Sequence, residues 1–514
     1  MERYFLGIDI GTFESRGILI DESFRVAADA SVPHGMDNPQ PGWFEQDAEA
    51  VWWGDLCKLC RTLIKQSGIR PEQIACVGTS ALGTDCLPVD EQGRPLRPAI
   101  LYGIDARASE EAAWLTEHYG QARVQELFGH PICSGDTATK ILWLRRHEPE
   151  IYAKTAYFLT GSSFLTARLT GKYVIDQFLA KGSFRPLYQA DGSVNEAECG
   201  LYCRPDQIAA CAWSTDIVGT VTPEAAAQTG LAAGTPVITG TGDSTAEAIS
   251  VGLVEPGTAF FQYGSSMFYY YCTDRFVGSY VSPQGNGTLK GGKAFTVPGT
   301  YCLGDGTNAA GTLTRWVRDL LYSKELDAEK QGGENAYAVM AREAAAVPPG
   351  SDGLIMLPYI YGERSPLQDA EATGMLFGLK GTHGRAQINR AALEAVGYST
   401  YQHLLLFEEL GVPPRRIITA GGGTKNAAWM QIICDMAGMP LTIPEPFQCS
   451  SYGDAMLAAL GIGALESFAA LCAALPQGRI LQPDRKNHEF YQEHYPIFRD
   501  LYLENRDRMH RMQK

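Results

Sequence analysis

Asp243 stands where a carboxylate could exchange protons with a bound molecule. It follows the short apolar run 236–238 and a turn with glycines at positions 240 and 242, and it opens an alanine-rich segment. The glycines let the backbone turn sharply and approach a ligand closely. The pattern predicts a strand-to-helix corner, with the carboxylate beside the free amide groups of the helix. Two interpretations stay open: a helix cap, for which aspartate is a preferred residue, and a catalytic group.

Asp9 is the second candidate, because it ends an apolar segment at residues 4–10. Gly11 and Thr12 follow it, and Arg16 begins the return segment. This predicts a hairpin whose tip offers backbone amides and a hydroxyl to a phosphate. At the strand end Asp9 could orient a metal-bound water, and Arg16 could meet phosphate charge. The alternative is a hairpin that uses glycine and threonine for turn geometry only.

The same strand, small-residue tip and strand return in the second half of the chain, at residues 258–271. Here the tip is Gly264, Ser265 and Ser266. Each half therefore opens with the same motif. Two such hairpins facing each other could grip a polyphosphate from both sides.

Further polar and glycine-rich loops follow predicted strands, where open α/β sheets place ligand contacts. Gly83 and Thr84 follow the strand predicted at 74–80, and Tyr102 and Asp105 follow another strand. Residues 421–423 are three consecutive glycines between a predicted strand and a helix, which is more than a turn needs.

Gly453 and Asp454 repeat the Gly-Asp pair of the Asp243 corner, again before an alanine-rich segment. We expect Asp454 to be a structural version of that corner, capping a helix. Tyr491, Tyr495, Phe498 and Tyr502 indicate a terminal amphipathic helix packed on the body.

The whole chain fits a cytoplasmic two-domain protein. Its 514 residues are too many for one core. A net charge of −15 argues against nonspecific binding to nucleic acid or anionic membrane. We expect neither a secretory signal nor a membrane span, and the odd number of cysteines, 13, suggests reduced thiols. Cys57 and Cys60 form a lone C-x-x-C that suits core packing.

Two stretches make the sequence resemble the FGGY family of carbohydrate kinases. Residues 135–147, GDTATKILWLRRH, are similar to the family's first signature around Lys-x-x-Trp. Residues 374–379 and 388–394 match its second signature. The resemblance implies two ribonuclease-H-like α/β domains, the actin and hexokinase arrangement, flanking a central cleft. We expect an N-terminal domain at 1–250 that binds sugar and carries the base, a nucleotide-binding domain at 251–465, and a helical tail at 466–514.

The resemblance also implies a role for each candidate. Asp243 matches the base that takes the proton from the sugar hydroxyl, and Asp9 matches the metal-linked aspartate. Gly83, Thr84, Tyr102 and Asp105 match sugar contacts. The expected contacts to ATP are Gly11, Thr12 and Arg16 in the first hairpin, Gly264, Ser265 and Ser266 in the second, Gly311 and Arg315 near phosphate or ribose, and Gly422, Gly423 and Asn426 at the adenosine.

Three departures from the family pattern bear on the substrate. The second hairpin reads Gly-Ser-Ser in place of Gly-Thr-Ser and keeps its hydroxyl. The Trp-x-Asp-x-Arg motif becomes the longer Tyr102-Gly-Ile-Asp105-Ala-Arg107. Gly83-Thr84 stands where xylulose kinases commonly have Met-His and glycerol kinases Arg-Glu.

The resemblance therefore implies a Mg²⁺- and ATP-dependent sugar kinase, acting on a ketopentose such as xylulose or ribulose. Alternatives are a kinase for a polyol or another keto sugar (glycerol, erythritol, a tetrulose or fuculose) and a nucleotide-gated regulatory ATPase on the same fold. By analogy with family members, a homodimer is possible.

Overall fold

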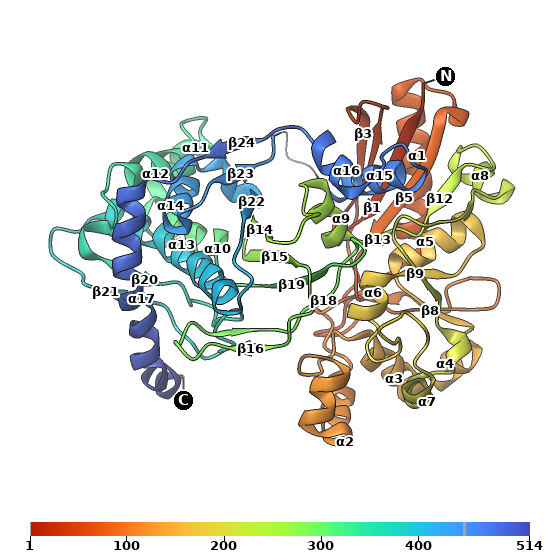
Figure 1. The fold of residues 1–514 in the computed structure, drawn as a ribbon, viewed down its shortest axis with the longest axis horizontal. Coiled ribbons are helices and arrows are strands. Elements are labelled where there is room, and N and C mark those ends of the chain that lie inside the picture. Colours follow the sequence, from red (N-terminus) through yellow and green to blue (C-terminus); the bar gives the residue numbers. More distant parts are fainter. Residues whose placement is uncertain (1, 446–448, 514) are drawn as a thin grey trace.

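The computed structural model describes residues 2–445 and 449–513, which form two α/β domains (Figure 1). The first sheet opens with three antiparallel strands, and two further strands run parallel to the first of these on its other side. Their order is β3 (Val26–Pro33), β2 (Glu14–Ile20), β1 (Tyr4–Ile10), β5 (Ile74–Ala81) and β12 (Pro236–Ile238), with β11 (Ile217–Thr220) at the edge.

The second sheet repeats this order with new strands, so the expected pair of ribonuclease-H-like domains is confirmed. Three antiparallel strands again come first, and two parallel strands follow. They are β19 (Tyr301–Gly306), β15 (Met267–Thr273), β14 (Thr258–Tyr263), β22 (Arg416–Ala420) and β23 (Leu441–Ile443), extended by β18 (Lys293–Ala294) and β24 (Arg479–Leu481).

The first helical segment of this domain follows Asp47: it begins as a π-helical turn, Ala48–Trp53, and continues as α1 (Gly54–Ser67). Asp47 accepts hydrogen bonds from the amides of Glu49 and Ala50, as a cap does. Other helices of this domain are α2 (Ser109–Leu127), α3 (Thr137–His147), α4 (Pro149–Lys154), α5 (Gly161–Thr170), α6 (Gln177–Gly182), α7 (Glu196–Tyr202), α8 (Pro223–Thr229) and α9 (Asp243–Ser250).

Around the second sheet the long helix α13 (Arg385–Glu409) packs against α14 (Ala427–Ala437). The terminal helix α17 (Arg485–Met512) buries Tyr491, Tyr495 and Phe498, which confirms the predicted packed tail. The remaining helices of this region are α10 (Gly311–Leu321), α11 (Ser323–Lys330), α12 (Ala336–Ala345) and α16 (Phe468–Ala474).

One helix lies apart from its neighbours in sequence. The helix α15 (Ser450–Gly461) packs on β1, β5 and α9, beside the first sheet in Figure 1, although it follows the strands of the second. The expected range 251–465 thus ends in a helix that belongs spatially to the first domain. Asp454 lies inside α15 and does not begin it, so the predicted cap is wrong.

Two further observations concern membrane-spanning helices and the C-x-x-C pair. Among the residues described, no helix is both long enough and apolar enough to cross a membrane. Cys57 and Cys60 lie buried on α1 as free thiols, which confirms the core-packing interpretation of the C-x-x-C pair.

Candidate functional site

The corner that holds Asp243 is built by glycine. Gly240 has a positive φ of +79°, and a Cβ there would lie 2.2 Å from the Thr79 carbonyl oxygen. This close approach lets β13 (Thr241–Gly242) pair with the end of β5, with Thr241 opposite Ser80. Helix α9 then begins at Asp243, so the carboxylate is presented at the carboxyl edge of the first sheet, as predicted.

Asp243 is not the capping residue of α9. The residue at the cap position is Gly242, and the Asp243 carboxylate accepts only the adjacent Ser244 N–H through Oδ1, at 2.6 Å. Burial raises the pKa of Asp243 to about 6, and the Ser244 N–H opposes this rise. A partly exposed carboxyl with such a pKa is suited to accept a proton near neutral pH.

Two more carboxyls face Asp243. Burial and the Asp243 charge raise the pKa of Asp9 well above its usual range, and the same two causes raise the pKa of Glu247 to about 7. Asp9 lies opposite Ser80 in the β1–β5 register, and Glu247 is one turn after Asp243 on α9. The structure therefore brings the two predicted catalytic aspartates together.

The first hairpin has the predicted tip. The Gly11 amide donates to the Glu14 carbonyl across the turn, and the Thr12 hydroxyl lies 3.2 Å from the Tyr102 hydroxyl. Arg16 lies opposite Asp9 in the β1–β2 register, is partly exposed and pairs with Asp29 at 3.3 Å. Thr12 and Tyr102, expected to contact ATP and sugar respectively, are thus neighbours.

The second hairpin is held from behind by the start of α10. The Gly311 amide donates to the Gly264 carbonyl at 2.9 Å, and the Thr312 amide donates to the Ser265 carbonyl at the same distance. A Cβ on Gly311 would lie 2.5 Å from the Gly264 oxygen, so only glycine fits against the tip without movement. Ser266 closes the turn through its carbonyl, which accepts the Gly264 amide.

A cavity of about 490 Å³ lies beside this hairpin and collects most of the expected nucleotide contacts. Its wall includes the apolar side chains Tyr337, Leu393 and Trp429, which could cover a flat ring. Asn389 Oδ1 and Trp429 Nε1, on two of the lining residues, have no hydrogen-bond partner among the residues that the structure describes. The expected residues in the wall are Gly264, Ser265, Gly311, Arg315, Gly422, Gly423 and Asn426.

The three glycines after β22 have different roles. Gly421 has a φ of +91° and lies against the Tyr263 backbone, and a Cβ on Gly423 would lie 2.8 Å from the Tyr263 Cβ. These two are required by the fold. Gly422 has an ordinary φ and nothing within 4 Å of its Cβ position, yet it lines the cavity. The open space at Gly422 is therefore room for a ligand.

Gly422→Ala is expected to leave the melting temperature unchanged while weakening binding of ATP and ADP by roughly tenfold. The added methyl meets no protein atom, so only a bound nucleotide can feel it, at the usual cost of overpacking. Calorimetric titration with ADP measures the effect. Gly423→Ala is the control, because it should lower the melting temperature. Unchanged ADP affinity in Gly422→Ala would remove this loop from the nucleotide site.

The expected sugar-binding loop packs directly against the Asp243 corner. A Cβ on Gly242 would lie 3.8 Å from the Gly83 Cα. The fully buried Lys140 on α3 donates to the Thr84 carbonyl at 2.6 Å and to the Gly135 carbonyl at 3.0 Å. The lysine of the first signature thus fixes the backbone of the Gly83-Thr84 loop.

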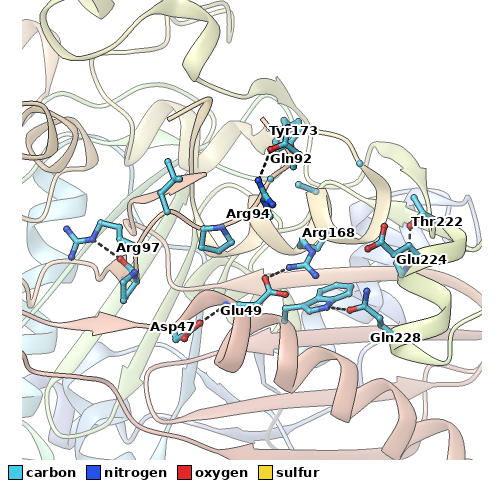
Figure 2. A pocket seen from close by; sticks show the side chains of 18 of the residues that line it. Asp47, Glu49, Gln92, Arg94, Arg97, Arg168, Tyr173, Thr222, Glu224 and Gln228 are labelled. Carbon is cyan, nitrogen blue, oxygen red and sulfur yellow. Dashed lines mark hydrogen bonds and ion pairs between the residues drawn. The ribbon is translucent and has the colours of Figure 1, made fainter. Parts of the chain in front are cut away.

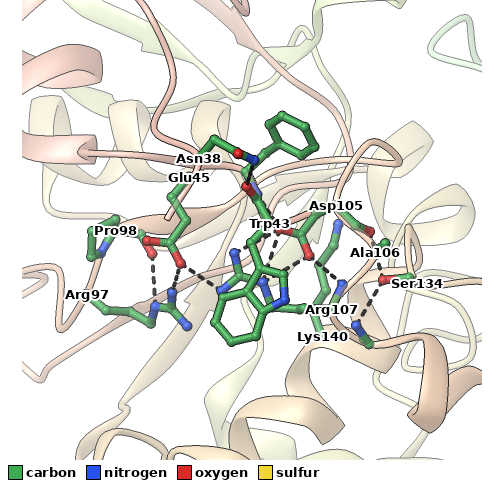
Figure 3. Close-up of polar contacts among 12 residues, drawn as sticks. Asn38, Trp43, Glu45, Arg97, Pro98, Asp105, Ala106, Arg107, Ser134 and Lys140 are labelled. Carbon is green, nitrogen blue, oxygen red and sulfur yellow. Dashed lines mark hydrogen bonds and ion pairs between the residues drawn. The ribbon is translucent and has the colours of Figure 1, made fainter. Parts of the chain in front are cut away.

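Asp105 lies in the network of hydrogen bonds and ion pairs that Figure 3 shows. Its carboxylate accepts the Phe44 amide at 2.7 Å and the Arg107 guanidinium at 2.8 Å, and its side chain has no exposed area. Arg107 in turn stacks over Trp43 and Trp143, with its Cζ atom 4.3 and 5.2 Å from the ring centroids. The structure therefore encloses Asp105 and leaves the neighbouring Tyr102 to face Thr12.

Family models decide the membership of the chain. The model of the FGGY family of carbohydrate kinases, N-terminal domain, matches residues 4–250, and the model of the C-terminal domain matches residues 263–462. The chain belongs to the FGGY family of carbohydrate kinases. It is therefore a sugar kinase, and the function implied by the two signatures is confirmed at this level.

Individual FGGY kinases with different substrates resemble the chain almost equally. It is 29% identical to the xylulose kinase of Escherichia coli over 501 residues, covering 97% of this chain and 98% of that one. It is 28% identical to the gluconokinase of Bacillus subtilis over 506 residues, covering 98% and 96%. The crystal structure of xylulose kinase from Rhodospirillum rubrum superposes with a TM-score of 0.88 at 28% identity, covering 99% and 100%.

The carboxyls of the site suit the Mg²⁺ that FGGY kinases typically use with ATP. Within the described parts of the chain, no three His, Cys, Asp or Glu residues surround one point as a metal cage would. Mg²⁺ bound with a nucleotide needs no such cage, because it keeps several waters and takes one or two carboxylates beside the phosphates. Asp9, for which the resemblance predicts this role, is partly exposed at the hairpin.

Sequence reasoning missed three contributors. Ser80 forms a hydrogen bond with Asp9, and Asp454 forms one with Ser80. Glu247 lies near Asp243, and its pKa is raised by burial and by the Asp243 charge. Glu247 could have been found from its i, i+4 spacing to Asp243, which places both on one helix face. Asp454 could not, because Ser80, its hydrogen-bond partner, lies 374 residues away in sequence.

A more spacious hollow of about 1270 Å³ lies away from this site (Figure 2). Its charged side chains are largely matched within the protein: Arg168 pairs with Glu49, and Arg94 with Asp90 at 2.8 Å. The wall contains none of the predicted site residues. We assign it no role in the kinase reaction.

Proposed function

We propose that this FGGY kinase transfers the γ-phosphate of Mg-ATP to a hydroxyl of a ketopentose such as xylulose or ribulose. The observation that carries the proposal is Asp243, whose raised pKa and free Oδ2 stand beside Asp9 and next to the Gly83-Thr84 loop. The similarity to xylulose kinases favours a ketopentose among sugars.

In this proposal Asp243 accepts the hydroxyl proton at Oδ2, because Oδ1 is held by the Ser244 amide. The hydroxyl oxygen then attacks the γ-phosphorus in line with the leaving oxygen of ADP. The tips at Gly11-Thr12 and at Gly264-Ser265 hold the phosphates, and positioning supplies most of the catalysis. Mg²⁺, when bound, offsets charge on the phosphoryl oxygens.

A coupled ADP-release screen tests the proposal. The panel should contain pentuloses, hexuloses, tetruloses, polyols and aldonates, since gluconokinases are as similar to this chain as xylulose kinases. The expected result is the highest kcat/KM with a pentulose. A clear preference for glycerol or gluconate would overturn the assigned sugar, and ATP hydrolysis indifferent to every sugar would favour the regulatory ATPase.

The pH dependence of kcat/KM should follow the deprotonation of Asp243. The base must be deprotonated to accept a proton, so kcat/KM should fall about tenfold per unit as pH drops below about 6 and level off above it. A steady-state series from pH 4.5 to 8.5, with ADP binding followed at each pH, measures this limb. A limb near pH 4, the ordinary range for aspartate, would contradict the assignment.

A further inference from the structure

A short hydrogen-bonded series connects Asp9 to the far end of the chain. The Ser80 hydroxyl oxygen lies 2.8 Å from Asp9 Oδ1 and 2.6 Å from Asp454 Oδ2. Asp454 has no exposed area, and its other oxygen, Oδ1, has no hydrogen-bond partner within residues 2–445 and 449–513. Asp9 is therefore hydrogen-bonded to Ser80, which is hydrogen-bonded in turn to the buried Asp454.

The single hydroxyl hydrogen of Ser80 limits how this serine can bond to the two carboxyls. A serine hydroxyl has one hydrogen to donate, yet Ser80 makes two short contacts to carboxyl oxygens. One of the two carboxyls must therefore carry a hydrogen and donate it to Ser80. Asp454 has no exposed area whereas Asp9 is partly exposed, so burial favours the neutral, protonated form at Asp454 and makes it that donor. Ser80 is then free to donate to Asp9.

Close packing of α15 sets this geometry. A Cβ on Gly7 would lie 1.9 Å from the Ser451 carbonyl oxygen, and one on Gly78 would lie 2.3 Å from the Asp454 carbonyl oxygen. On the other side of α15, a Cβ on Gly453 would lie 1.9 Å from the Ala246 carbonyl oxygen. Glycines on β1 and β5 therefore let α15 press against the strands that carry Asp9 and Ser80, and Gly453 seats it against the helix of Asp243.

We propose that Asp454 is a positioning residue, which fixes the Asp9 carboxylate through the Ser80 hydroxyl so that its remaining oxygen faces the metal–nucleotide. This rests on the proposed function, in which Asp9 serves Mg-ATP. Asp454 itself touches neither substrate. It is enclosed between the first sheet and α9, and it acts only through Ser80.

The test compares Asp454→Ala with Asp454→Asn in the full-length protein. An asparagine amide can donate to Ser80 as the protonated acid does, whereas alanine cannot. The first readout is binding of Mn²⁺ in the presence of ADP, followed by electron paramagnetic resonance of free Mn²⁺. The second is the separation of kcat from the KM for sugar.

Asp454→Ala should weaken Mn²⁺ binding about tenfold and lower kcat, with little change in the KM for sugar, as expected for losing a hydrogen bond to a charged group. Asp454→Asn should restore both to within about twofold of wild type. Ser80→Ala breaks the same series and should match Asp454→Ala, with no further loss in the double variant; it also serves if Asp454→Ala does not fold.

Asp435→Ala is the matched control, because Asp435 is a buried helical aspartate of the second domain bonded to Gln431, Asp484 and Asn487. It should lower stability without changing Mn²⁺ affinity. Wild-type Mn²⁺ affinity in Asp454→Ala and Ser80→Ala, or no rescue by Asp454→Asn, would overturn the inference. Failure of the proposed function would instead appear as a wild-type protein that phosphorylates no pentulose, whatever its Mn²⁺ affinity.

Discussion

Asp243→Asn is expected to lower kcat by about 10²–10⁴-fold while ADP binds as it does to wild type. The substitution keeps the shape of the side chain and removes its ability to accept a proton. Because Asp243 does not line the nucleotide cavity, the affinity for ADP should not change. Coupled kinetics at saturating sugar and calorimetric titration with ADP measure the two quantities separately.

The control for this prediction separates catalysis from capping. Asp47 is a true cap, which accepts two amides at the start of the π-helical turn Ala48–Trp53. Asp47→Ala should cost about 1 kcal/mol of stability and leave turnover intact. If Asp243→Asn turned over sugar at a near-normal rate, the base would have to be sought elsewhere, and Glu247, the next carboxyl on the same helix face, would be the first residue to test.

Local sequence patterns predicted a site residue where that residue and the glycine that shapes its turn stand in the same short segment. The corner at Asp243 and the tips at Gly11 and Gly264 each combine a strand end with the glycine that turns it, so spacing alone located them. The signature lysine, Lys140, was found through the resemblance to the family's first signature, and its two carbonyl acceptors were not predicted. These turns could be recognised because the glycine and the candidate residue stand next to each other in the sequence, although distant residues also contact them.

The parts that sequence did not predict depend on contacts between distant residues. Asp454 follows a glycine and precedes an alanine-rich segment, as Asp243 does, and the two patterns cannot be told apart locally. They differ because Gly453 contacts Ala246 in mid-helix, whereas Gly242 pairs with a strand. Asp105 was expected to contact sugar from its loop position, but Arg107, two residues later, pairs with it and is covered by two indoles.

Lys140→Met should cause the largest loss of stability among these substitutions, about 3–5 kcal/mol. Lys140 and Asp85 are both fully buried, and each charge opposes the pKa shift that burial causes in the other: the pKa of Lys140 is lowered and that of Asp85 is raised. In the described part of the chain, neither oxygen of Asp85 has a hydrogen-bond partner. Removing the ammonium leaves this carboxyl and the Thr84 and Gly135 carbonyls without their cation.

The loss should appear as a fall of roughly 10 °C in the melting temperature of the first domain, measured by scanning calorimetry. It should also raise the KM for sugar, because the Gly83-Thr84 loop loses its anchor. Lys65→Met, on the exposed end of α1, is the matched control and should change neither quantity. Adding Asp85→Asn to Lys140→Met should recover part of the stability, since no uncompensated charge then stays buried. A double variant less stable than Lys140→Met would show that Asp85 does not depend on Lys140.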